Sequence, residues 1–185
     1  LDGEAYMVSL FYRLGVRQML FAYNRNNLAG GGCHDEDQGL TDFGRRVVEE
    51  MNRVGMMVDC SHTGYRTSMA VLEAASAPVI FSHSSARALC DSPRNVSDAV
   101  LRQVAANGGV VMVNYAPQYI SEARRVWGAA RSAEIARNNA PPFGGLHIGD
   151  PVAAKVALEL WEKANPEPVA TLGQVADHID HIAKV

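Results

Sequence analysis

The stretch Met57-Val58-Asp59-Cys60-Ser61-His62 has an echo in Val79-Ile80-Phe81-Ser82-His83-Ser84-Ser85. Each stretch is a short apolar run that leads into Ser-His, and residues 63–78 between the two runs have helical character. This pattern predicts a strand, a helix and a second strand, which together make one βαβ unit. The two histidines are 83 − 62 = 21 residues apart, which is about the length that such a unit needs.

His62 and His83 are candidate metal ligands, because each follows the end of a predicted strand. Neighbouring parallel strands lie roughly 4.8 Å apart, so two imidazoles at the same edge of a sheet could bind one ion. A single histidine there is more often structural, but two in equivalent positions favour a ligand role. A catalytic zinc site needs at least three protein ligands, and the sequence alone does not complete the set. Asp59 could be a ligand or could orient a ligand imidazole.

The alternation of strands and helices extends to both sides of this unit. Strands are predicted at residues 18–23, 56–60, 78–82 and 110–115, and helices at 4–14, 42–54, 65–75 and 97–107. Thr41 is the expected N-cap of the second helix, and Gly55 is the residue expected to end it. Continuous apolar strands that alternate with helices indicate a parallel sheet covered by helices.

The last third of the chain is predicted to be mostly helical. Helices are expected at residues 120–138, 150–165 and 171–184, with a loop at 139–149. His178 and His181 are spaced i, i+3 in the last helix, a spacing that can bind a metal. Because no glutamate accompanies them as in a His-Glu-x-x-His motif, we expect an exposed helix surface instead.

The composition is that of about one globular domain with a hydrophobic core, since 48% of the 185 residues are hydrophobic and 20% are charged. A net charge of −3 argues against a nucleic-acid partner. No apolar stretch approaches the ~18 residues of a membrane span. The three cysteines are too scattered for a disulfide framework or a zinc site, so we expect reduced thiols and a cytoplasmic location. Without an initiator methionine, an internal piece of a longer protein is expected.

Two further features each have a chemical and a structural interpretation. The run Cys33-His34-Asp35-Glu36-Asp37 has the composition of a cation site, but acidic loops are usually solvated, and we favour solvation for His34. Arg94 lies on the same rim as His83, and it is either a surface arginine or a bidentate clamp for a carboxylate. No phosphate-binding glycine motif and no Gly-x-Ser-x-Gly motif occurs, so nucleotide binding and serine-hydrolase chemistry have no support.

Several motifs in the chain resemble those of the membrane dipeptidase (renal dipeptidase) family of zinc peptidases, whose bacterial members are soluble. They are Leu14-Gly15-Val16-Arg17, Gly39-Leu40-Thr41-Asp42-Phe43-Gly44, Val58-Asp59-Cys60-Ser61-His62, Pro78-Val79-Ile80-Phe81-Ser82-His83-Ser84-Ser85-Ala86 and Pro93-Arg94-Asn95-Val96, in this order. The resemblance is most specific from about Leu10 to Tyr115.

The resemblance implies an α/β fold of the (β/α)8 TIM-barrel type, of which this chain covers roughly the middle strands plus later helices. We expect a single partial metallo-hydrolase barrel domain over residues 1–185, with the loop 24–40 and the helical segment 118–170 as excursions. The family binds two zinc ions at the carboxyl ends of its strands. Its His-x-Asp pair and bridging Glu would precede Leu1, and a further Asp would follow Val185.

The resemblance also assigns roles to individual residues. His62 and His83 would be ligands of one zinc ion, and Arg94 would hold the carboxylate of the C-terminal residue of a dipeptide. Tyr23 occupies the position of a family histidine that contacts substrate. A phenol could still hydrogen-bond a developing oxyanion, but it cannot offer a positive imidazolium.

The expected function is therefore that of a zinc-dependent dipeptidase, which hydrolyses dipeptides with a metal-activated water. A catalytically incomplete barrel fragment, a pseudoenzyme and another metal-dependent amidohydrolase are the alternatives. The predicted strands at residues 18–23 and 110–115 would be sheet edges, which invite pairing with another chain. We therefore also expect a homo-oligomer.

Overall fold

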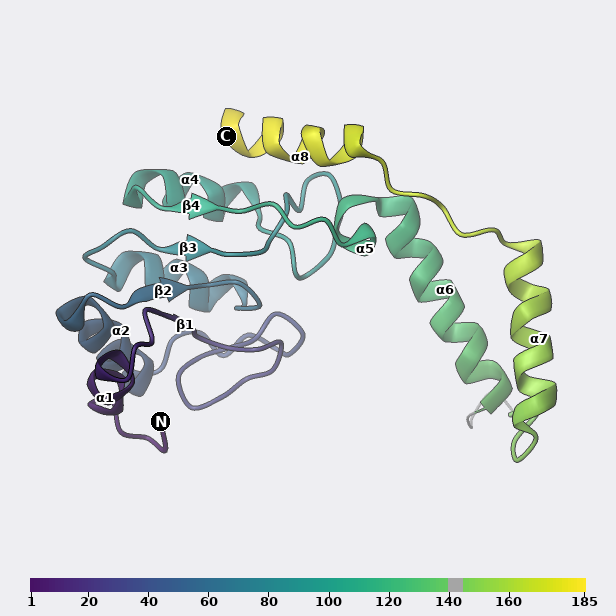
Figure 1. Ribbon diagram of the computed structural model, residues 1–185, viewed down its shortest axis with the longest axis horizontal. Helices are drawn as coiled ribbons and strands as arrows, with labels where there is room; N and C mark the ends of the chain where they lie inside the picture. The colour runs from purple at the N-terminus through teal and green to yellow at the C-terminus, as the bar shows by residue number, and fades with distance from the viewer. Residues whose placement is uncertain (140–144) are drawn as a thin grey trace.

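A parallel sheet forms the centre of the structure, a computed structural model that describes residues 1–139 and 145–185. The strands span Gln18–Leu20 (β1), Met57–Asp59 (β2), Ile80–Phe81 (β3) and Val110–Val111 (β4). The strand order is β1-β2-β3-β4, so each strand pairs with its neighbours along the chain (Figure 1). Asp59 lies opposite Ile80 in the pairing of β2 with β3. The predicted α/β fold with a parallel sheet is confirmed.

The strands are shorter than the sequence predicts, most clearly at the two edges of this sheet. Regular pairing covers three residues in β1 and two in β4, whereas six were predicted for each, at 18–23 and 110–115. Beyond β1, Phe21 N donates to Asp59 O at 3.2 Å. Beyond β4, Met112 N donates to Phe81 O at 2.8 Å and Met112 O accepts from Ser84 N at 3.0 Å. The carboxyl halves of both predicted strands were therefore wrong, because the chain leaves the sheet there to form the rim of the site.

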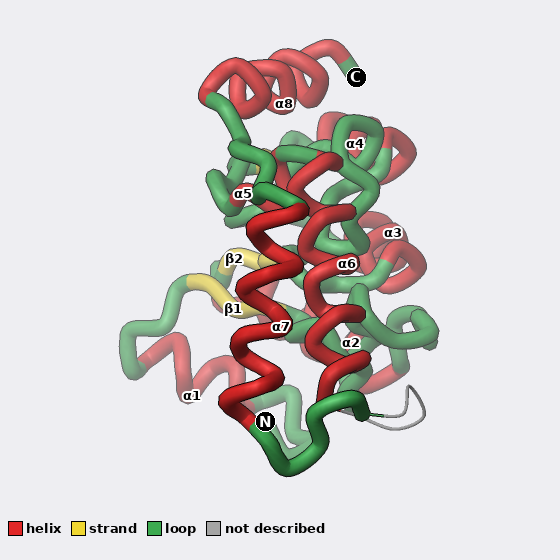
Figure 2. Tube along the Cα trace, turned by 90° about the vertical axis from the view of Figure 1, so that its right-hand side faces the viewer, coloured by secondary structure: helices red, strands yellow, loops and turns green. Residues whose placement is uncertain are grey.

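Three helices lie along one face of the sheet: α2 (Asp42–Val54), α3 (Tyr65–Ala74) and α4 (Asp98–Asn107) (Figures 1 and 2). Helix α1 (Met7–Arg13) packs against α2. Each large apolar side chain that is buried contributes about 1.5–3 kcal/mol. The core between the helices and the sheet includes Val47, Val48, Met51, Val58, Val71, Val79, Phe81, Val100 and Val104.

Local sequence signals set the ends of these helices as predicted. The hydroxyl oxygen of Thr41 accepts a hydrogen bond from Gly44 N at 3.0 Å and so caps the start of α2. Helix α2 ends at Gly55, whose φ of 82° lies in the left-handed region that favours glycine. Gly108 ends α4 in the same way.

The last third contains α5 (Pro117–Ile120), α6 (Glu122–Asn139), α7 (Pro151–Ala164) and α8 (Leu172–Lys184). The helix predicted at 120–138 is confirmed as α6, except at its start, where the extended Ser121 separates Ile120 of α5 from α6. In the predicted loop at 139–149, residues 140–144 lie outside the described residues. Over the rest of the chain, no helix combines the length and the apolar character that crossing a membrane requires.

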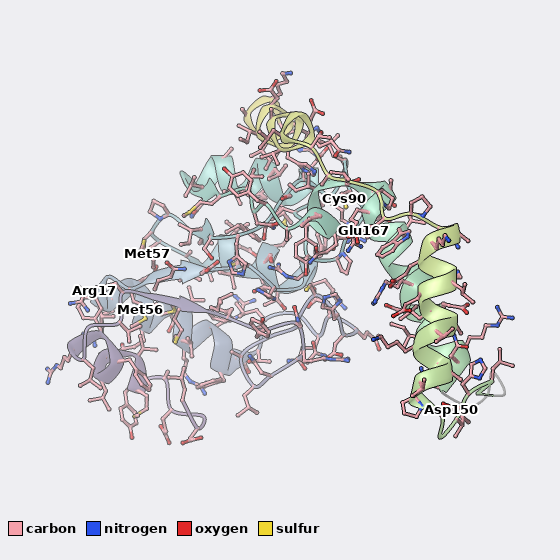
Figure 3. All side chains as sticks on the ribbon, turned by 45° about the vertical axis from the view of Figure 1, so that its right-hand side comes forward. Arg17, Met56, Met57, Cys90, Asp150 and Glu167 are labelled. Carbon is pink, nitrogen blue, oxygen red and sulfur yellow. The ribbon has the colours of Figure 1, made fainter. Side chains whose placement is uncertain are left out.

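Helices α6 and α7 form a hairpin that stands away from the sheet (Figure 1). Figure 3 places Asp150 at the outer end of this hairpin and Glu167 near its inner end. The side chains of Arg131 and Glu162 join the two helices through an ion pair of 2.6 Å. The chain then returns in α8, which lies beside α5 and above α4 in Figure 1.

His178 in α8 is fully buried, so the exposed helix surface predicted for His178 and His181 was wrong. The His178 Nδ1 atom accepts a hydrogen bond from Ala86 N at 2.9 Å, and its Nε2–H donates to Ile120 O at 3.0 Å. His181 is partly buried and pairs with Asp98 of α4 at 2.8 Å. The helix therefore fastens the segment after β3 to the end of α5.

Replacing His178 by leucine should destabilise the protein by about 2–4 kcal/mol, because a buried N–H and a buried C=O both lose their partner. Equilibrium urea unfolding measures this loss. The control is His181→Ala in the same helix, which removes only a partly exposed pair and should cost less than about 1 kcal/mol. Equal losses in the two variants would show that His178 has no special structural role.

Candidate active site

His62 and His83 meet at the carboxyl edge of the sheet, as the sequence predicts. Their Nε2 atoms lie 2.8 Å apart, and the two rings are edge to face with centroids 4.8 Å apart. His62 has a φ of 67°, which is unusual for a residue other than glycine and costs of order 1 kcal/mol or more. Such strain persists only where the surroundings hold it, and it is common at functional sites.

The hydrogen bonds at the other nitrogen of each ring define where the protons lie. His62 Nδ1 is 2.7 Å from Asn24 Oδ1, an amide oxygen that can only accept, so Nδ1 carries the proton. His83 Nδ1 is 2.7 Å from Ser82 Oγ, and the Ser82 hydroxyl donates to the Asp59 carboxylate. Ser82 Oγ must therefore accept from His83 Nδ1–H. Both Nε2 atoms are left with lone pairs that face each other, an arrangement that a cation between them would stabilise.

Burial lowers the pKa of His62 to about 4, and the positive charges of Arg94 and His83 act in the same direction. Burial, followed by the charge of Arg94, also lowers the pKa of His83. Both imidazoles are therefore neutral near pH 7. The neutral form is the one that binds a metal ion, because protonated imidazole has no free lone pair.

Asp59 is fully buried and reaches His83 only through Ser82. Its carboxylate also accepts hydrogen bonds from Gln18 Nε2 at 2.8 Å, Ser61 N at 2.9 Å and Ser82 N at 3.1 Å. Burial alone would raise the pKa of Asp59, but the bonds from Ser82 and Ser61 outweigh it, so the net shift is downward. Of the two roles predicted for Asp59, these contacts favour orientation of an imidazole over direct ligation.

Arg94 and Tyr23, the two predicted substrate contacts, each contact one histidine of the pair. Only 4% of Arg94 is exposed, and its Nη2 donates to His83 O at 3.2 Å. Within the described part of the chain, Arg94 Nε and Nη1 have no hydrogen-bond partner. The Tyr23 ring stacks on the His62 imidazole with centroids 4.2 Å apart, and 69% of Tyr23 is exposed. Arg94 is therefore not the surface arginine of the alternative interpretation.

The loop 24–40, which the sequence predicts to be an excursion from the barrel, builds one wall of the site. Cys33 N donates to His62 O at 2.9 Å, and Asn24 holds the His62 ring. A Cβ atom added to Gly32 would collide with the backbone of Asn24 and Arg25, so only glycine fits there. The three consecutive glycines were the available signal, because glycine in a long loop often marks a close approach of two backbone segments.

The acidic part of this loop is structural, so the expectation of a merely solvated run was wrong for Asp37. Asp37 Oδ1 accepts from Thr67 Oγ1 at 2.8 Å, and Oδ2 accepts from Arg66 N in the first turn of α3. This carboxylate therefore caps α3, which follows His62 in the chain. His34 is exposed. Across residues 1–139 and 145–185, no group of three or more His, Cys, Asp or Glu side chains is arranged to hold a metal ion.

The fold and the site define a parallel α/β protein with two metal-competent histidines at the carboxyl edge of its sheet. The sequence matches the profile of the membrane dipeptidases, peptidase family M19, over residues 1–185. The chain therefore belongs to the membrane dipeptidase family, as the motifs predicted.

Individual relatives agree with this assignment. The chain is 45% identical over 122 residues to an uncharacterised dipeptidase of Schizosaccharomyces pombe, a match that covers 64% of this chain and 30% of that protein. The probable dipeptidase PvdM of Pseudomonas aeruginosa superposes with a TM-score of 0.77 at 28% identity, over 98% of this chain and 51% of PvdM. A Rhodobacter sphaeroides metallopeptidase, solved with a phosphinate mimic of the dipeptide L-Ala-D-Ala, gives a TM-score of 0.60 at 26% identity, over 88% of this chain and 53% of its own. The chain thus spans between about a third and a half of these relatives.

The metal-free protein should lose stability as the pH falls from about 6.5 to about 4. The fold lowers the pKa of His62 from 6.5 to about 4, so within this window the unfolded chain binds about one more proton at this position. Lower pH then favours unfolding. Urea unfolding at several pH values, in the presence of a chelator, measures the slope. His62→Gln should make the slope shallower, and an unchanged slope would contradict the shift.

Proposed function

We propose that this chain is part of a zinc-dependent dipeptidase in which His62 and His83 bind one zinc ion and Arg94 binds the substrate carboxylate. The observation that carries the proposal is the pair of unprotonated Nε2 atoms, 2.8 Å apart, beside a buried guanidinium. Membership of a metallopeptidase family supports a metal at this place.

The residues present fit a zinc ion. Imidazole nitrogen is a preferred zinc ligand with a bond of about 2.0–2.1 Å, and 2.8 Å is less than twice that length, so one ion can contact both rings. Two imidazoles do not complete a catalytic zinc site, and the proposal therefore includes further ligands and, as the family resemblance implies, a second zinc ion. When bound, zinc supplies a Lewis acid that polarises a carbonyl group and lowers the pKa of a water molecule.

Arg94 supplies the specificity for a free carboxylate. A buried guanidinium with two unpartnered nitrogen atoms is unfavourable unless an anion binds there. Its planar donors match a carboxylate in a bidentate arrangement, which favours short peptides with a free C-terminus near the scissile bond. The dipeptide mimic bound by the Rhodobacter sphaeroides relative supports this substrate class.

Tyr23 is placed to contact the substrate over the histidine pair. Its exposed ring covers His62, and its phenol can donate a hydrogen bond to the oxyanion that forms when the peptide carbonyl is attacked. This donor is neutral, so it stabilises that charge less than an imidazolium would.

The proposal extends to the rest of the predicted architecture. Sequential, all-parallel strands with covering helices support a (β/α)8 barrel, of which β1 to β4 are four strands. We also propose that residues 1–185 form one partial barrel domain and that the protein is a homo-oligomer. The three free cysteines are compatible with a reducing, cytoplasmic location.

In the full-length protein, His62→Ala and His83→Ala should each remove zinc and abolish dipeptide hydrolysis. Elemental analysis of the purified variants and an assay with L-Ala-D-Ala measure the two effects. The matched control is His34→Ala, an exposed histidine that should keep both. Zinc content that survives either site substitution would rule out that ligand role.

Arg94→Ala should lower kcat/KM for a dipeptide about 10- to 100-fold, since a hydrogen bond to a charged group contributes about 1.5–3 kcal/mol. Arg94→Lys keeps the positive charge, so kcat/KM should fall by a smaller factor than in Arg94→Ala. Some loss should remain, because lysine cannot form the bidentate pair with a carboxylate. The control substrate is the same dipeptide with its C-terminus amidated, on which the variants should match the unaltered enzyme. An equal loss on both substrates would contradict the carboxylate clamp and would favour another metal-dependent amidohydrolase.

A further inference from the structure

We propose that Ser82 and Asp59 are positioning residues for the metal centre, in which the serine hydroxyl connects a buried carboxylate to the imidazole of His83. This inference rests on the metal site of the proposed function. It assigns a task to two residues that touch neither the ion nor the substrate.

The connection is a continuous chain of hydrogen bonds. The Asp59 carboxylate accepts from the Ser82 hydroxyl, and Ser82 Oγ accepts from His83 Nδ1–H over 2.7 Å. Every donor in this chain has one acceptor, so the direction of each proton is fixed. The unprotonated His83 nitrogen is consequently Nε2, which faces His62 at 2.8 Å.

Three strands hold the carboxylate in place. Asp59 ends β2 and is fully buried, Gln18 of β1 donates to it at 2.8 Å, and the Ser82 backbone after β3 donates to it at 3.1 Å. A rigidly held negative charge behind the serine polarises the hydroxyl, and through it makes His83 Nε2 a stronger electron donor. Carboxylate–histidine pairs have this effect in metal sites, and their loss typically weakens metal binding 10- to 100-fold.

The two imidazoles are therefore not equivalent. The neutral amide of Asn24 holds His62, while His83 is connected to a full negative charge. Metal binding by His83 should therefore depend more strongly on its supporting residues than metal binding by His62 does. Ser82→Ala removes the hydroxyl bridge but leaves the backbone N–H that donates to Asp59, so it tests the bridge with little other change.

The test measures zinc affinity in the full-length protein by competition with a chromophoric chelator, without substrate. Ser82→Ala should weaken zinc binding about 10- to 100-fold, and Ser82→Thr, which keeps a hydroxyl, should restore most of it. The control is Ser85→Ala, which removes a buried hydroxyl from the same Ser-His-Ser-Ser run; in the described part of the chain this hydroxyl has no hydrogen-bond partner. It should bind zinc as the unaltered protein does.

The melting temperature of the metal-free variants separates positioning from simple support of the fold. Metal-free Ser82→Ala should melt somewhat below the unaltered protein, because the buried Asp59 carboxylate loses one of its donors. Positioning predicts in addition that zinc raises the melting temperature of the variant less than that of the unaltered protein. The inference would be overturned if Ser82→Ala bound zinc within about threefold of the unaltered protein, or if Ser85→Ala lost as much zinc affinity as Ser82→Ala. Zinc binding with the predicted dependence but no dipeptide hydrolysis would overturn the proposed function alone, whereas a protein that binds no zinc would overturn both.

Discussion

The site depends on the parallel register of β2 and β3. Asp59 lies opposite Ile80, and each of these residues is followed by a histidine three positions later, at His62 and His83. Because the two offsets are equal, both imidazoles lie at the same height along the strands, at the carboxyl edge of the sheet. A slip of one residue would turn each side chain of one strand to the other face and would separate the pair. The repeated Ser-His ending is therefore a consequence of strand register, and the same register brings Ser82 onto Asp59.

Strain in the loops is the second condition for this geometry. Asn24 and His62 have φ values of 66° and 67°, a backbone region that residues other than glycine rarely adopt. The side chains of these two residues hydrogen-bond each other. Neither conformation would persist alone. Gly32 lets the two loop segments approach closely enough for this contact, and Cys33 N holds the His62 carbonyl. The glycine-rich loop thus stabilises the left-handed conformation of His62.

Features that depend on neighbours in the sequence could be predicted, and features that depend on distant partners could not. Alternating apolar strands, the Thr41 cap and the Gly55 stop are local, and the meeting of His62 with His83 follows from one βαβ unit. The burial of His178 depends on Ala86, which is 92 residues away in the sequence. Nothing in an i, i+3 pair of histidines indicates such a contact. The strand lengths were missed for a similar reason, since loop contacts rather than propensity decide where pairing stops.

The charges around the histidine pair set a further constraint on how the site works. Arg94 lies close enough to lower the pKa of both imidazoles, and the positive potential that repels protons also opposes a metal cation. The negative charge of Asp59 offsets part of this potential, because it acts on the pKa of both imidazoles in the opposite direction to Arg94. A carboxylate bound to Arg94 would neutralise the remainder. Metal and substrate would then strengthen each other's binding by the same factor, because such a coupling is reciprocal.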